Sequence, residues 1–122
     1  DVCTAISMAI DKEVNEMKKI IKTPEEIRRD ELVCDVRDKK EYIESTVLHI
    51  RRRQKAMSML PEFTREYEQF YILLEEDKCT LALAMRNYET ARETLKNHCQ
   101  QYHLAGNTFI PAMELLEILA EK

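Results

Sequence analysis

In this chain of 122 residues 34% of the residues are charged, and only one glycine and three prolines interrupt it. This composition favours long helices with solvated faces and excludes a sheet protein, which needs a turn about every 8–12 residues. The net charge of -4 argues against a nucleic-acid partner, because phosphate binding needs a wide basic surface. No apolar run approaches the roughly 20 residues that cross a bilayer, so membrane insertion is not expected.

The first expected helix covers residues 2–22. Its apolar residues recur every three or four positions and form one stripe, made of Cys3, Ile6, Ile10, Val14, Met17 and Ile21. A second helix is expected over residues 24–59, because Thr23 and Glu26 form a capping box and Pro24 suits the first turn. Its apolar stripe consists of Val33, Val36, Ile43, Val47, Ile50, Met57 and Leu60.

A third helix is expected over residues 61–105, beginning at Pro61 and ending before Gly106 and Asn107, which favour the left-handed conformation. Its apolar seam resembles that of a coiled coil and is broken at Asp77. The seam consists of Phe63, Tyr67, Phe70, Leu74, Leu81, Ala84, Tyr88, Ala91, Leu95, His98 and Tyr102. A continuous helix over residues 24–105, kinked at Pro61, satisfies the same pattern. A short fourth helix is expected over residues 110–121.

These elements predict an all-α fold: an antiparallel up-down-up bundle of long, coiled-coil-like helices with a short fourth helix folding back at the C-terminus. No repeat or internal linker divides the sequence, so residues 1–122 are interpreted as a single domain. The first residue is Asp1 rather than methionine. The native chain is therefore expected to be processed, or to be part of a longer protein.

Three consecutive arginines, Arg51, Arg52 and Arg53, stand out in an acidic chain. If the chain turns near residue 60, residue n of the second helix lies level with residue 121 − n of the third. This places the arginines near Glu66 and Glu68, so the first interpretation is a solvated face with cross-helix ion pairs. The alternative interpretation is the polar rim of an interface.

The same alignment leaves the first helix too short to cover residues 61–75, and the fourth helix too short to reach them. The tip of the hairpin, roughly residues 46–75, is nevertheless its most apolar part, and Tyr71, Ile72 and Leu73 extend beyond the seam. Exposed apolar patches rimmed by charge mark interfaces. The expected partner-binding residues are Val47, Ile50, Arg51, Arg52, Arg53, Met57, Phe63, Tyr67, Phe70, Tyr71 and Leu74. Alternatively, residues preceding Asp1 extend the first helix and complete the core there.

Catalytic and metal-binding motifs are not recognisable in the sequence. Cys99 and His103 lie one helical turn apart, which is half of a zinc site, but structural zinc needs four ligands. No catalytic residue, metal or cofactor is therefore expected.

The four cysteines do not form two disulfides in this arrangement. Cys3 is placed level with Cys79 and is positioned to pair with it. Cys34 and Cys99 are separated by about 18 Å along the bundle axis, whereas a disulfide needs Cα atoms within about 7 Å. This spacing favours reduced cysteines and a cytoplasmic, intracellular location.

The function that these features favour is a non-enzymatic protein–protein interaction module, an adaptor or scaffold. Its partner is expected to be an amphipathic helix or a second copy forming a homodimer. Two alternatives stay open. The four cysteines and the missing methionine fit a secreted, disulfide-stapled bundle of the cytokine or carrier type. The pair of Cys99 and His103 is the only feature that fits an enzyme or a metal carrier.

Overall fold

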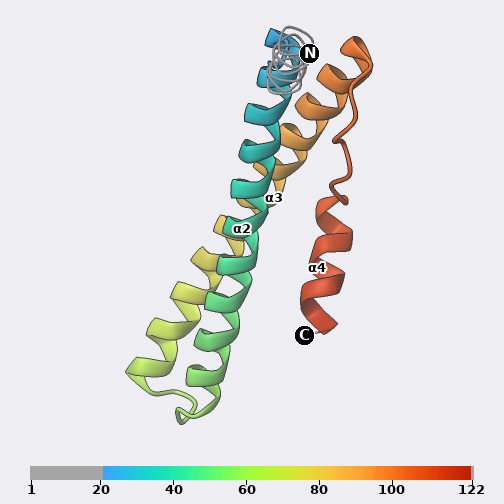
Figure 1. Cartoon of the computed structure of the whole chain (residues 1–122). Coiled ribbons are helices and arrows are strands. Elements are labelled where there is room, and N and C mark those ends of the chain that lie inside the picture. The colour runs from blue at the N-terminus through green and yellow to red at the C-terminus, as the bar shows by residue number, and fades with distance from the viewer. Residues whose placement is uncertain (1–20, 122) are drawn as a thin grey trace, which may run out of the picture.

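A computed structural model describes residues 21–121, which contain the helices α2 (Pro24–Ser58), α3 (Arg65–Tyr102) and α4 (Ala112–Glu121). All regular structure in this part of the chain is helical, as predicted. Helices α2 and α3 pack together as an antiparallel hairpin, and α4 lies beside it (Figure 1). The helix predicted over residues 2–22 lies outside the described residues except for Ile21 and Lys22, which are not helical.

Helix α2 begins as its sequence predicts. The Thr23 hydroxyl accepts a hydrogen bond from the backbone N–H of Glu26 at 3.2 Å, and Pro24 occupies the first turn, where its missing N–H costs nothing. The helix ends at Ser58, one residue before the predicted end. Local capping chemistry therefore sets the start of α2.

The turn between α2 and α3 corrects two predictions. The chain reverses over residues 59–64, so the continuous kinked helix is wrong. Helix α3 begins at Arg65 rather than at 61, because the Thr64 hydroxyl caps it by accepting the N–H of Tyr67 at 3.3 Å. Phe63 therefore lies in the turn with a φ of 66° and is 92% exposed, instead of facing α2.

Helix α3 ends at Tyr102, three residues before the predicted end. His103 adopts the left-handed conformation there with a φ of 54°, and its N–H is donated to the Cys99 carbonyl. The loop that follows packs back on α3, where the N–H of Leu104 also reaches the Cys99 carbonyl at 2.9 Å. As a result Cys99 is buried, whereas the predicted seam residue Tyr102 is 42% exposed.

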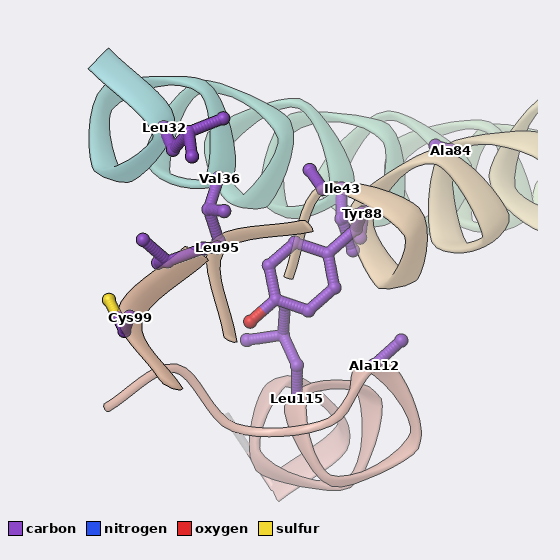
Figure 2. Packing of buried hydrophobic residues seen from close by; sticks show 10 residues of the cluster. Leu32, Val36, Ile43, Ala84, Tyr88, Leu95, Cys99, Ala112 and Leu115 are labelled. Atoms are coloured by element: carbon purple, nitrogen blue, oxygen red, sulfur yellow. The ribbon is translucent and has the colours of Figure 1, made fainter. Parts of the chain in front are cut away.

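The core lies between the middle parts of α2 and α3 and extends to α4 (Figure 2). Val36, Ile43, Tyr88 and Leu95 have no accessible surface, and all four belong to the predicted stripes. At the end of the hairpin that is distant from the turn, the buried residues differ from the predicted ones. Leu32 is buried instead of Val33, and Cys99 is buried instead of His98. The His98 side chain is half-buried, and its Nε2 lies 2.8 Å from the Glu25 carbonyl.

Helix α4 is held at both ends by side chains of the hairpin. At its start, the Tyr88 hydroxyl donates to the Ile110 carbonyl at 2.7 Å, and the Glu89 carboxylate accepts the N–H of Ala112 at 2.5 Å. At its end, the Arg51 guanidinium donates to the Leu119 carbonyl. An anion at the N-terminus and a cation at the C-terminus both interact favourably with the helix dipole. The hairpin thus fixes the position and the direction of α4.

The hydrogen bond between Glu89 and α4 predicts a pH dependence of stability. Burial acts to raise the pKa of Glu89, but the Ala112 N–H and the Arg92 side chain outweigh it and hold that pKa below its ordinary value. Because the folded pKa is the lower one, the contribution is present above the unfolded pKa of about 4.3 and is lost as pH falls through the folded pKa. As the pH falls from about 5 to 3, we expect the free energy of unfolding, measured by urea denaturation, to decrease less in Glu89→Gln than in the unchanged protein. The exposed Glu93→Gln is the control, and equal slopes for the two variants would contradict this role.

Candidate functional site: the tip of the helical hairpin

The three arginines have three different environments. The Arg51 guanidinium binds the Leu119 carbonyl in α4. Arg53 donates to the carboxylate of Asp77 at 2.9 Å and to the Leu73 carbonyl at 3.3 Å. Arg52 is exposed, and no ion pair involves it among residues 21–121. Two of the three arginines therefore hold helices together.

The predicted ion pairs with Glu66 and Glu68 are wrong. Helix α3 starts four residues later than predicted (65 instead of 61), so the facing residues come from further along α3. The partner is instead Asp77, the residue that interrupts the apolar seam. Its side chain is only 15% exposed, that of Arg53 is 24% exposed, and His49 Nε2 lies 3.9 Å from the second carboxylate oxygen. The break in the seam is thus an interhelical charge pair.

Beyond this pair, the tip of the hairpin contains a groove of about 310 Å³ between α2 and α3, hereafter the tip groove. Its lining residues are Gln54, Met57 and Ser58 from α2 and Tyr67, Tyr71, Leu74, Glu75 and Lys78 from α3. Leu74 is buried, whereas Tyr71 is 54% exposed. The groove therefore combines an apolar base with an accessible aromatic side chain.

Two further hollows adjoin the tip groove. One of about 290 Å³ lies at the end of α4 and is lined by Val47, Ile50, Arg51, Gln54, Leu81, Leu116 and Ala120. It shares Gln54 with the tip groove. The other, of about 430 Å³, lies on the outer side of α3 and shares Tyr71 and Glu75 with the tip groove; Ile72, Glu76 and Cys79 complete it. The space beside α4 thus continues toward the tip of the hairpin.

No protein-family model, curated protein or solved structure matches this chain. The functional interpretation therefore depends on the geometry of the hairpin. None of the helices in the described range 21–121 has both the length and the apolar character needed to cross a bilayer.

The predicted partner-binding residues separate into three groups. Met57, Tyr67, Tyr71 and Leu74 come together in the tip groove. Val47, Ile50 and Arg51 lie around the end of α4, which reaches further along the hairpin than predicted. The remaining four line neither hollow: Arg52 is exposed, Arg53 pairs with Asp77, Phe63 lies in the turn, and Phe70 is half-buried.

Sequence reasoning missed several residues of this surface. Gln54 links the tip groove to the hollow at the end of α4, and its only signal is that it interrupts the apolar stripe of α2. Leu116 and Ala120 contribute through the position of α4, which no local pattern indicates. Ile72, by contrast, was expected to be exposed, and it is 58% exposed in the hollow on the outer side of α3.

Metal and thiol chemistry has little support in this part of the chain. No group of three or more potential metal ligands occurs among residues 21–121. Cys99 is buried with its sulfur 3.9 Å from the Ala105 carbonyl, whereas Cys34 and Cys79 are exposed. These three cysteines are not bonded to one another. The predicted pairing of Cys3 with Cys79 involves a residue outside the described range.

Proposed function

We propose that this protein is a non-enzymatic interaction module, an adaptor or scaffold, that binds an amphipathic helix or a second copy of itself through the tip groove. The observation that carries the proposal is an apolar groove lined by Met57, Tyr67, Tyr71 and Leu74 at the end of a two-helix section. Aromatic and methionine side chains are enriched in interface cores, and a groove between helices accepts apolar anchors at helical spacing.

The exposure of the residues around the groove supports the same proposal. Tyr71 and Ile72 are 54% and 58% exposed, and Met59 at the start of the turn is 73% exposed. Neighbouring exposed apolar side chains gain free energy when a partner removes them from water, about 25 cal/mol for each Å². Covering the tip is therefore favourable for any helix of matching shape.

The up-down-up bundle is the arrangement we propose for the whole domain. Residues 2–22 carry an apolar stripe and would pack on the hairpin as a third long helix, antiparallel to α2. Their predicted length, about 30 Å at 1.5 Å per residue, covers the half of the hairpin that is distant from the tip.

The test compares two tyrosines with the same exposure. Tyr71 at the tip is 54% exposed, and Tyr42 on α2 is 55% exposed. We expect Tyr71→Ala to weaken association at least fivefold, which is about 1 kcal/mol, as for a moderate hot spot. Its free energy of unfolding should change by less than about 1 kcal/mol. Tyr42→Ala should change neither quantity.

Association is measured in two ways. Sedimentation velocity of the protein over a range of concentrations reports self-association. Fluorescence anisotropy with a labelled two-heptad amphipathic peptide that does not belong to this chain reports binding of an amphipathic helix. If Tyr71→Ala lowers stability by about 3 kcal/mol and leaves association unchanged, the tip is a core and not an interface.

A reducing, intracellular location is part of the proposal and predicts free thiols. Cys34 and Cys79 are exposed, Cys99 is buried, and the three thiols are unbonded to one another. We expect at least two free thiols per chain when protein isolated without reductant is unfolded and titrated with a thiol reagent. A result of no free thiol would favour the secreted, disulfide-stapled bundle instead.

A further inference from the structure

We infer that the occupant of the tip groove is a single amphipathic helix from outside these 122 residues, lying end to end with α4 along the hairpin. This inference rests on the proposed function and makes it more specific. Three observations carry it: the continuity of the groove with the α4 site, the reach of the chain's own segments, and the charges on the two sides of the groove.

The first observation is that α4 already occupies the same channel. Its apolar residues Ala112 and Leu115 are buried against the hairpin, and its last turn ends at the hollow that shares Gln54 with the tip groove. Figure 1 shows the hairpin continuing beyond the end of α4. A second helix in the tip groove would extend a helix–hairpin interface that exists in this fold.

The second point is reach: α4 ends before the tip groove, and the helix that the sequence predicts over residues 2–22 would be too short for it. Met57 lies about 50 Å along α2 from Thr23, whereas a helix over residues 2–22 is about 30 Å long. Helix α4 ends at Glu121, beside Arg51 and Leu81. If residues 2–22 form the predicted helix, the occupant comes from outside these 122 residues.

A second copy of the chain fits the groove less well than a single helix. A two-fold pair of hairpins with tips at the same end would place α4 against α4 and hold the tips apart. A pair with opposed tips would place α2 against α2, so that Lys55 of one copy lies near Lys55 of the other. Like charges across an interface suppress association. A single helix avoids both the contact between two α4 helices and the repulsion between like charges.

The third observation is the charge on the two sides of the groove. On the α2 side, the exposed Lys55 lies one turn from Ser58, which lines the groove. On the α3 side, Glu68 precedes Tyr71 by three residues and Glu75 lines the groove, with Lys78 Nζ 3.3 Å from a Glu75 carboxylate oxygen. The complementary helix has acidic residues along the flank that faces α2 and basic residues along the flank that faces α3.

The experiment uses the full chain and stapled two-heptad peptides as probes. Each has leucine at the groove-facing positions; one has glutamate on one flank and lysine on the other, a second has glutamate on both, and a third has lysine on both. A scrambled peptide of the first composition controls for non-specific contact. Affinity is measured by anisotropy, and the bound site is mapped by ¹⁵N chemical-shift changes.

The mixed-flank peptide is expected to bind at least fivefold more tightly than either single-charge peptide. Its shift changes should cluster around Met57, Tyr71 and Leu74, and Tyr71→Ala should weaken it about tenfold while Tyr42→Ala does not. Equal affinity for all three charge patterns would overturn the assignment of the flanks. Failure of every peptide to bind the tip would overturn the helical occupant. If the protein instead forms a dimer that Tyr71→Ala abolishes, this inference fails and the proposed function stands.

Discussion

Replacing Tyr88 with alanine is expected to lower the free energy of unfolding by about 3–5 kcal/mol, the range for truncating a large buried aromatic residue. Tyr88 has no accessible surface and lies among residues of all three described helices (Figure 2). Its hydroxyl also binds the Ile110 carbonyl. Since single domains are stable by only about 5–15 kcal/mol, this is the most damaging substitution that we predict.

Tyr88→Phe separates the two roles of that side chain. It keeps the ring and removes the donor to the Ile110 carbonyl, so we expect a smaller loss of about 1–3 kcal/mol. Hydrogen exchange should become faster in α4 while the middle of α2 stays protected, because the lost bond anchors the segment that leads into α4. Urea denaturation gives the free energies, and Tyr102→Ala, at 42% exposure, is the control within α3. A Tyr88→Ala protein as stable as the Tyr102→Ala protein would contradict the central position of this residue.

Breaking the charge pair at the seam is expected to have the second largest effect. Arg53→Ala or Asp77→Ala should each lower the free energy of unfolding by about 1–3 kcal/mol, because either change leaves a poorly exposed charge without its partner. The double variant, Arg53→Met with Asp77→Leu, should regain most of this loss, because apolar residues can replace an ion pair whose side chains are only 24% and 15% exposed.

Arg52→Glu is the control for the pair, and it should change stability by no more than about 0.5 kcal/mol, as exposed substitutions do. A double-mutant cycle on Arg53 and Asp77 measures their coupling directly, and we expect it to exceed about 0.5 kcal/mol. Additive single effects would show that the two side chains contribute separately and that the contact at 2.9 Å adds no stability.

The sequence by itself determined the features that depend on neighbouring residues. Thr23 and Pro24 set the start of α2, because a helix cap involves groups only a few residues apart. The three- and four-residue spacing of Val36, Ile43 and Leu95 identified the buried faces, because helical periodicity needs no knowledge of the partner helix. The exposure of Tyr71 followed from its place beside the seam and off the face that meets α2.

The tertiary structure alone decided the features that join residues distant in the chain. The turn over residues 59–64 sets the register of the hairpin, and a start of α3 at Arg65 brings Arg53 to Asp77 instead of to Glu68. The loop after α3 buries Cys99, and α4 binds the Arg51 side chain, which was expected in a solvated face or at the rim of an interface. These contacts depend on the length and direction of the turns, for which the sequence offers only single capping residues such as Thr64. The tip groove exists for the same reason: the place where α4 ends on the hairpin decides which part of the apolar seam stays uncovered.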